Sequence, residues 1–343
     1  MKATAIAPAN IAFIKYWGKS DDALRLPLNS SISMNLSNTY TTTTVEFSSL
    51  LKEDVIEFIN LDKSYQLKQL HDLVWSMDRF NDGEKERVVS HIDRIRAITQ
   101  SHLFAKVVTQ NNFPTGVGIA SSASGFAALT VAAIAALELN LSEKELTILA
   151  RLGSGSACRS IPDGFVVWNK GNSSQTSYAH SLYPSSYWDL RDIIAVVETK
   201  EKEISTSRGM DKIRMSPFWK ERIEAIPKKI LQTKKALEEK NFTKLGELIE
   251  EDCLNMHHVM QTQDPPLYYW NDTTRVLMET VADWRKEGIP VYFTIDAGPN
   301  VHLICEAMNE QVVVKKLKEI SAIKQIIINN PARGAHLTGK HLF

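Results

Sequence analysis

The chain has 343 residues, 43% of them hydrophobic, so it can bury a substantial core as one large domain or as two domains of ordinary size. Its 40 Lys and Arg residues balance its 40 Asp and Glu residues, and the formal net charge is zero. Because no overall field attracts polyanions, nucleic acid is disfavoured as the main partner, although a local cluster of Lys and Arg could bind an anionic metabolite.

The N-terminal segment, residues 1–14, is largely apolar, carries only Lys2 before its apolar part and leads into the charged Lys15 and Lys19. This pattern predicts a strand over residues 4–15 and is not typical of a signal peptide. A second strand is predicted over residues 39–47, where β-branched residues are frequent.

The next segments in chain order are a loop, a helix and a short strand. Residues 26–36 contain Pro27 and several Ser and Asn residues, which favour a loop. Residues 71–98 have helical spacing and many charges, so we expect a helix with one solvated face. Residues 105–109 predict a strand.

A segment rich in Gly and Ser, PTGVGIASSASGFAAL at residues 114–129, joins an Ala-rich helical run at 126–139. Small residues allow a close approach of the backbone to a ligand, and a helix N-terminus offers unpaired N–H groups to anions. The segment therefore indicates a phosphate-binding loop or, equally well, a tightly packed helix start. It is neither a Walker A motif nor a dinucleotide fingerprint.

A second helix is predicted over residues 142–152, where Ser142 and Glu145 form a capping box. It leads into GSGSACRS at residues 153–160, which adds an Arg to further small and hydroxyl residues. A strand is predicted over residues 165–168.

The C-terminal half alternates strands with helices, which favours an α+β sandwich. The predicted strands cover residues 193–198, 291–295, 301–306 and 324–328, and the predicted helices cover 217–238, 242–260, 273–287 and 309–319. We place the lobe boundary near residues 180–190, giving an N-terminal lobe over 1–185 and a C-terminal lobe over 186–343.

The three cysteines, Cys158, Cys253 and Cys305, are far apart and odd in number, which suits a reducing compartment. The longest apolar stretch beyond the N-terminus, residues 126–139, is too short and too rich in Ala to span a bilayer. We therefore expect a cytoplasmic enzyme.

Five blocks of sequence resemble the diphosphomevalonate decarboxylase family in order and spacing. The blocks are ANIAFIKYWGK at residues 9–19, LPLNSSISMNL at 26–36, NNFPTGVGIASSASGFAAL at 111–129, GSGSACRS at 153–160 and DAGPNVH at 296–302. The resemblance covers nearly the whole chain. It implies the fold of the galactokinase, homoserine kinase, mevalonate kinase and phosphomevalonate kinase superfamily, with a ribosomal-protein-S5-like N-terminal lobe and a ferredoxin-like C-terminal lobe.

The resemblance also implies a reaction and its cofactors. ATP phosphorylates the tertiary 3-hydroxyl of mevalonate 5-diphosphate, and loss of that phosphate draws electrons from the C–CO₂ bond to give isopentenyl diphosphate and carbon dioxide. Such a site needs a carboxylate near the hydroxyl, cations for the anionic groups and a cradle for ATP and Mg²⁺. The implied partner is the small-molecule substrate.

The resemblance assigns three catalytic residues: Asp296, Lys15 and Arg159. Asp296 would be the base or the orienting group for the 3-hydroxyl, although a turn Asp before Gly-Pro is the alternative. Lys15 lies in an apolar strand, where an unpaired charge is costly, but it could also extend its ammonium from the strand end to solvent. Arg159 would hold the substrate carboxylate, unless it forms a surface salt bridge.

The remaining assignments concern substrate and nucleotide binding. The resemblance matches Tyr16, Lys19, Ser154 and Ser156 to substrate phosphates. For ATP it implies Gly116, Gly118, Ala120, Ser121, Ser122, Ser124, Ser205, Thr206 and Ser207. We assign no metal ligands, since the adjacent His257 and His258 would point in different directions on a helix. A homodimer is the default oligomer.

The sequence departs from the diphosphate-specific pattern after Arg159-Ser160, where it reads Ile161, Pro162, Asp163 and Gly164. A negative Asp163 near a substrate phosphate would favour a substrate with fewer phosphates, so mevalonate 5-phosphate decarboxylation is the alternative. A mevalonate 3-kinase or a non-catalytic nucleotide sensor is less consistent with the complete Lys15, Arg159 and Asp296 set. RNA binding through the S5-like lobe would require a basic face.

Overall fold

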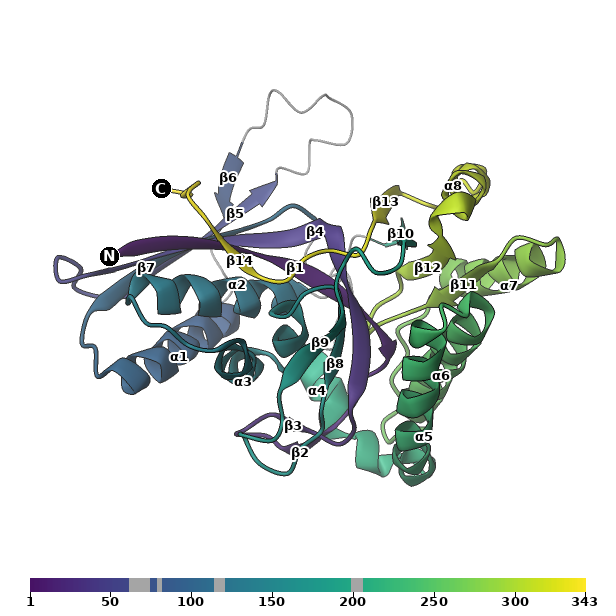
Figure 1. Ribbon diagram of the computed structural model, residues 1–343, viewed down its shortest axis with the longest axis horizontal. Helices are drawn as coiled ribbons and strands as arrows, with labels where there is room; N and C mark the ends of the chain where they lie inside the picture. Colours follow the sequence, from purple (N-terminus) through teal and green to yellow (C-terminus); the bar gives the residue numbers. More distant parts are fainter. Residues whose placement is uncertain (62–74, 79–81, 114–120, 199–205) are drawn as a thin grey trace.

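The computed structural model describes residues 1–61, 75–78, 82–113, 121–198 and 206–343. Two sheets lie side by side, each with its own helices (Figure 1). The chain therefore has the predicted α+β class.

The N-terminal sheet is built around two long antiparallel strands, β1 (Lys2–Ile14) and β4 (Ser31–Ser48). In the described part of the chain, its other strands are β7 (Phe104–Asn111), β5 (Val55–Leu61), β6 (Trp75–Asp78), β8 (Phe165–Trp168), β9 (Ala179–Tyr183) and β14 (His336–Thr338). Its helices are α1 (Asp82–Thr99), α2 (Ser121–Ala136) and α3 (Glu143–Gly153). The Ala-rich α2 is buried against β1 and β4, because small side chains allow close helix–sheet contact.

The C-terminal sheet is antiparallel, in the order β11 (Val291–Thr294), β12 (Val301–Glu306), β10 (Leu190–Val196) and β13 (Gln325–Asn329). Its helices are α5 (Trp219–Glu238), α6 (Phe242–Thr262), α7 (Asp272–Lys286) and α8 (Glu310–Lys318). Shorter elements are β2 (Lys19–Asp21), β3 (Leu26–Pro27), α4 (Thr206–Asp211), η2 (Gly155–Ser160), η3 (Ile213–Met215) and η4 (Ala307–Asn309).

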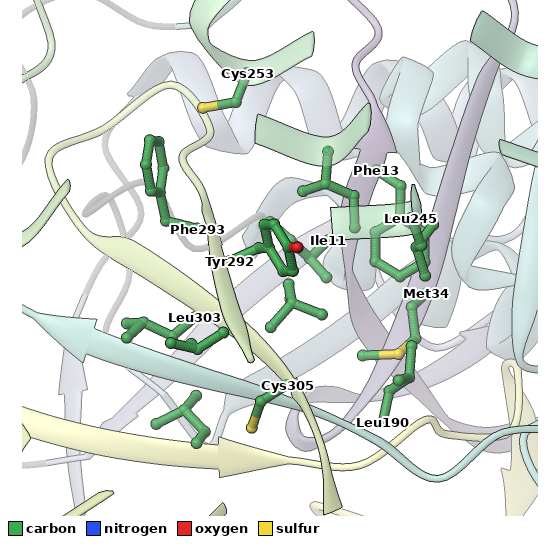
Figure 2. Close-up of a cluster of buried hydrophobic side chains, with 14 of the residues drawn as sticks. Ile11, Phe13, Met34, Leu190, Leu245, Cys253, Tyr292, Phe293, Leu303 and Cys305 are labelled. Atoms are coloured by element: carbon green, nitrogen blue, oxygen red, sulfur yellow. The ribbon is translucent and has the colours of Figure 1, made fainter. Parts of the chain in front are cut away.

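One hydrophobic cluster joins the two lobes. Ile11 and Phe13 of β1 and Met34 of β4 belong to the same buried cluster as Leu245 of α6 and Tyr292 of β11 (Figure 2). Since this apolar surface is shared, the end of β1 is held firmly against the C-terminal lobe.

Two predictions about secondary structure were wrong. Much of the expected loop at residues 26–36 belongs to β4, which starts at Ser31. Two of its buried polar side chains find partners there: Ser31 accepts a hydrogen bond from Arg159, and Asn35 donates to the carbonyl of Pro162.

The expected helix over 71–98 starts only at Asp82, and the segment Trp75–Asp78 is strand β6. This segment pairs with β5, so sheet hydrogen bonds override its helical spacing. Residues 71–74 and 79–81 lie outside the described residues. The other expected helices and strands are confirmed, with shifted ends.

The C-terminal strand β14 was not anticipated. It returns to the N-terminal sheet and pairs with β1, placing Thr338 opposite Thr4. The proposed division at residue 185 stays a prediction. Among the described helices, none combines the length and apolar character that crossing a membrane requires.

Candidate active site

The centre of the candidate site is an ion pair between the lobes. Lys15 follows the last residue of β1, and its side chain is only 2% exposed. Its ammonium lies 2.6 Å from Oδ1 of Asp296, which follows β11 in the C-terminal lobe. The pairing explains how a Lys is tolerated at the end of an apolar strand, because a buried ammonium without a partner would be costly.

The electrostatic surroundings keep Asp296 ionised. Burial alone would raise the pKa of Asp296, but the charges of Lys15 and His302, the hydrogen bond from Lys15 and the charge of Arg159 outweigh burial and lower it. A carboxylate in this state can accept a hydrogen bond or a proton from a hydroxyl.

Arg159 is buried and held by two polar residues of the N-terminal lobe. Its Nε and Nη2 donate to Oδ1 of Asn10 at 3.2 and 3.1 Å, and its Nη1 donates to Oγ of Ser31 at 2.8 Å. Burial lowers its pKa, against the opposing effects of Cys158, Asp296 and Tyr16. Within the described residues no carboxylate lies within ion-pair distance of Arg159, so its charge can receive an anionic ligand.

Tyr16 lies in a tight aromatic niche. Its ring meets Trp168 edge-on with centroids 4.6 Å apart, and a Cβ at Gly155 would lie 2.8 Å from Cε1 of Tyr16. Burial raises the pKa of Tyr16, so its hydroxyl stays protonated and can donate a hydrogen bond. The neighbouring Cys158 is buried and burial raises its pKa to about 12, which is unsuited to a nucleophile.

Lys19, in β2, forms ion pairs with Asp22 and, at 2.9 Å, with Asp211 of α4. Burial would lower the pKa of Lys19, but hydrogen bonds and charges of these two carboxylates outweigh it and raise the pKa. The ammonium therefore remains charged, and an incoming phosphate would compete with the two carboxylates.

The described end of the predicted phosphate-binding segment, at the start of α2, meets the GSGSACRS segment. Oγ of Ser122, in the first turn of α2, lies 3.1 Å from Oγ of Ser154. The first turn of α2 carries no acidic residue, so its N–H groups and the Ser121 and Ser122 hydroxyls fit an anion. Ser156 is partly exposed and belongs to η2, the short helix that also carries Arg159.

Ser124 takes a different position from its neighbours. It is fully buried, lies 2.7 Å from the hydroxyl of Thr41 and donates to the carbonyl of Ser121. Its side chain thus braces the start of α2 from within. Thr206 is the first residue of α4. Gly116, Gly118, Ala120 and Ser205 lie outside the described residues, as does the side chain of Ser207.

Several residues with a role in this site were not found from sequence. Asn10 and Ser31 hold Arg159, and Asp252 and Arg222 contact the backbone of Lys15. An Asn within an apolar strand was a usable signal for Asn10. The others become neighbours only through the fold.

A cavity of about 230 Å³ borders the same region. Gly153, which directly precedes Ser154, contributes to its lining together with Arg25, Arg87 and Arg94. Burial and the charge of Arg25 lower the pKa of both Arg87 and Arg94. Glu86 also lines the cavity, so the three guanidinium groups leave a net excess of positive charge there in a chain that is neutral overall.

Asp163, at which the sequence departs from the diphosphate-specific pattern, has structural neighbours. Its Oδ2 accepts the backbone N–H of Ser185 at 3.4 Å, and its charge, after burial, contributes to a raised pKa of Glu143 on α3. The preceding Pro162 is held by Asn35. Oδ2 of Asp163 thus has a backbone partner, whereas its Oδ1 is buried with no hydrogen-bond partner among the described residues.

The two adjacent histidines have unrelated surroundings, as expected. His257 is buried, with Nε2 at 3.2 Å from the carbonyl of Ile295, whereas His258 lies against Phe218. The part of the chain that the structure describes contains no cluster of three or more His, Cys, Asp or Glu residues suited to a metal ion.

Comparison with known protein families gives two matches that together cover most of the chain. Residues 7–179 match the diphosphomevalonate decarboxylase-like N-terminal domain, and residues 192–337 match the mevalonate 5-diphosphate decarboxylase C-terminal domain. The chain is also similar to the diphosphomevalonate decarboxylase of Candida albicans, with 34% identity over 92% of this chain and 87% of the relative.

Solved structures agree with these matches. A structure described as MDDEF in complex with MVAPP, AMPPCP and magnesium has a TM-score of 0.88 and 38% identity, covering 98% of this chain and 99% of its own. Mevalonate diphosphate decarboxylase from Staphylococcus aureus has a TM-score of 0.88 and 37% identity, covering 98% of both chains. The two-lobed fold expected from the sequence is therefore confirmed.

Proposed function

The chain belongs to the diphosphomevalonate decarboxylase family, and from this membership we propose that Asp296, Lys15 and Arg159 form the catalytic centre of its reaction. The reaction is the ATP-dependent decarboxylation of mevalonate 5-diphosphate to isopentenyl diphosphate, with ADP, phosphate and carbon dioxide as the other products. The monophosphate alternative is not favoured.

The observation that carries the proposal is the contact between Lys15 and Asp296. The substrate 3-hydroxyl oxygen attacks the γ-phosphorus of ATP. The ionised Asp296 accepts the proton of that hydroxyl or orients it during the attack. The Lys15 ammonium, 2.6 Å away, keeps Asp296 ionised and offsets negative charge on the transferring phosphoryl group.

Arg159 would act in the second half of the reaction. Its guanidinium binds the substrate carboxylate and orients the C–CO₂ bond. When the 3-phosphate leaves, the electron pair of that bond becomes the new C=C bond, and the carboxylate departs as carbon dioxide. The buried hydrogen bonds to Asn10 and Ser31 restrict the orientation of the guanidinium.

The phosphates would be bound on the N-terminal side of the site. Tyr16, Lys19, Ser154 and Ser156 are our candidates for the substrate diphosphate. The first turn of α2, with Ser121 and Ser122, would hold ATP phosphates, and Ser124 would brace that turn.

Further nucleotide contacts are assigned to Gly116, Gly118, Ala120, Ser205, Thr206 and Ser207. The reaction uses ATP and Mg²⁺. The serine hydroxyls near α2 are of the oxygen type that Mg²⁺ accepts, and the ion would neutralise phosphate charge. We also propose a cytoplasmic homodimer.

The direct test is release of carbon dioxide and ADP by the purified protein with Mg²⁺ and ATP. Mevalonate 5-diphosphate and mevalonate 5-phosphate would be supplied separately. Faster carbon dioxide release from the diphosphate supports the assignment, whereas a preference for the monophosphate contradicts it. ADP without carbon dioxide would indicate a 3-kinase, and no product from either substrate would refute an enzyme of this type.

A further inference from the structure

The backbone of Lys15 is held from the opposite lobe. The strand β1 ends at Ile14, so the peptide groups of Lys15 lie beyond the sheet ladder. The N–H of Lys15 donates to Oδ2 of Asp252 at 2.7 Å. Its carbonyl accepts from Nδ2 of Asn29 at 2.9 Å and from Nη2 of Arg222 at 3.4 Å.

The two residues from the C-terminal lobe form a buried ion pair with each other. Asp252 lies on α6 and Arg222 on α5, and both side chains are fully buried. Nη1 of Arg222 lies 3.0 Å from Oδ1 of Asp252, and Nη2 lies 3.2 Å from Oδ2. Oδ2 of Asp252 and Nη2 of Arg222 therefore bind each other and the backbone of Lys15 as well.

Stability alone does not explain why this ion pair is buried. A buried ion pair loses hydration on folding, and replacing it by apolar residues of similar size is often neutral or stabilising. Here Asp252 and Arg222 supply oriented polar groups to the backbone of Lys15 in the other lobe. The side chain of Lys15 in turn makes the ion pair with Asp296.

Position matters because Lys is a long side chain with four rotatable bonds. Fixing its Cα fixes the volume that the ammonium can reach. A displacement of about 1 Å in a reacting group can reduce the rate by about 100-fold.

We propose that Asp252 and Arg222 are positioning residues, which fix the backbone of Lys15 so that its ammonium meets Asp296. This inference rests on the proposed function of Lys15. The two residues touch no reacting atom, and they act through Lys15.

The main test is the double variant Asp252→Leu with Arg222→Met, which removes both charges and leaves neither one unpaired. We expect a folded protein in which kcat for carbon dioxide release falls about 10- to 100-fold, as for a misplaced catalytic group. KM for mevalonate 5-diphosphate and for ATP should change less than about threefold, since no proposed binding residue is altered.

The matched control is Asp54→Leu with Arg96→Met. This mostly buried pair also holds a backbone N–H, since Oδ1 of Asp54 accepts from Ala105 at 2.8 Å, but it lies within the N-terminal lobe and is bonded to neither Lys15 nor β11. Its kcat should stay near that of the wild type. An unchanged kcat in the folded Asp252/Arg222 double variant, or an equal fall in both double variants, would overturn the inference.

A second comparison covers the case in which the double variant does not fold. Asp252→Asn keeps an oxygen that can accept the Lys15 N–H, whereas Asp252→Ala does not. If the inference holds, kcat of Asp252→Asn should be at least about tenfold higher than kcat of Asp252→Ala, because the catalytic group regains its position. Equal kcat in these two variants would count against it. An inactive wild type would instead refute the proposed function.

Discussion

The guanidinium of Arg159 shares the amide oxygen of Asn10 between two of its nitrogens, at 3.2 Å from Nε and 3.1 Å from Nη2. Because Nη1 is bonded to Ser31, three of the five N–H donors are directed to neutral partners. The orientation of the planar group is thus set before any anion arrives. A cationic side chain without a planar guanidinium could keep the charge but not the orientation.

We therefore expect Arg159→Lys to reduce kcat/KM for mevalonate 5-diphosphate by about 100-fold or more, comparable with the loss of one oriented donor to a developing charge. KM for ATP should be little affected. Arg191→Lys is a suitable control, because Arg191 pairs with Asp189 and Glu310 away from the site. Near-normal kcat/KM in Arg159→Lys would show that orientation by the fork is unimportant.

For Asp296→Asn, we expect carbon dioxide release to fall by at least about 100- to 10,000-fold, the range for loss of general acid–base catalysis. Asn cannot accept the hydroxyl proton, and it removes the partner of the Lys15 ammonium. ATP affinity, measured by calorimetry, should remain nearly intact. An equal loss of ATP binding would argue that Asp296 maintains the site instead of taking part in the reaction.

The Lys15→Met variant should shift the acid limb of the pH–rate profile upwards. In the wild type, Lys15 is the largest of the influences that lower the pKa of Asp296 against the effect of burial. Without the ammonium, burial dominates, the pKa of Asp296 rises, and the carboxylate becomes protonated at a higher pH than before. Residual kcat/KM should therefore decline at a higher pH as the solution is acidified.

The control for this shift is Lys15→Arg, which keeps a positive charge beside Asp296 and should leave the acid limb near its wild-type position. Profiles of kcat/KM for all three proteins over the same pH range provide the comparison. Superimposable limbs for the wild type and Lys15→Met would mean that Lys15 does not control the ionisation of Asp296.

The sequence was sufficient to predict the long helices and strands with strong hydrophobic patterns, and to single out residues whose chemistry is unusual for their position. The capping box of Ser142 and Glu145 formed as predicted, because its hydrogen bonds are local. Lys15 could be singled out since a charge within an apolar strand needs a partner, and Asp296 followed from its motif. The ion pair between them supports treating them as one unit.

The failures have a common physical cause, which is dependence on distant partners. Ser31 and Asn35 resembled loop residues, yet each is buried in β4 with a partner far away in sequence. The contact of Asp163 with Ser185 likewise joins residues that are 22 positions apart in the sequence. Asp252 had no local signal either, because its contact with Lys15 spans the two lobes.

Stability should depend on pH through two buried histidines. Burial is the main cause that lowers the pKa of His91 and of His257 to about 3. In the unfolded chain a histidine binds a proton near pH 6.5, so acidification below about 6.5 favours the unfolded state, by up to about 1.4 kcal/mol per pH unit for each residue. The contribution is fully present above that pH and is lost progressively as pH falls towards 3.

The variant His91→Gln tests this directly. Urea denaturation at several pH values between 4.5 and 7 should give a free energy of unfolding whose slope against pH is shallower than in the wild type, by an amount that grows to about 1.4 kcal/mol per unit at the acid end. Thr130→Val removes the hydroxyl partner of His91 and should lower stability without changing that slope. An unaltered slope in His91→Gln would mean that His91 binds protons in the folded state.

The last prediction concerns Gly155, whose missing side chain makes room for Tyr16. An added Cβ would lie 2.8 Å from Cε1 and 2.9 Å from the hydroxyl oxygen of Tyr16, closer than real contacts allow. The ring also meets Trp168, so it has little space to retreat. Gly155→Ala should therefore displace the hydroxyl that we assign to the substrate diphosphate.

The expected result is a rise in KM for mevalonate 5-diphosphate of roughly tenfold, the effect of losing one hydrogen bond to a charged group. Gly339→Ala serves as the control, because a Cβ there meets no atom within 4 Å. KM for ATP should not change in either variant, since Tyr16 is assigned to the substrate alone. If Tyr16→Phe raises this KM and Gly155→Ala does not, the hydroxyl binds substrate but tolerates displacement, and Gly155 is not required for its position.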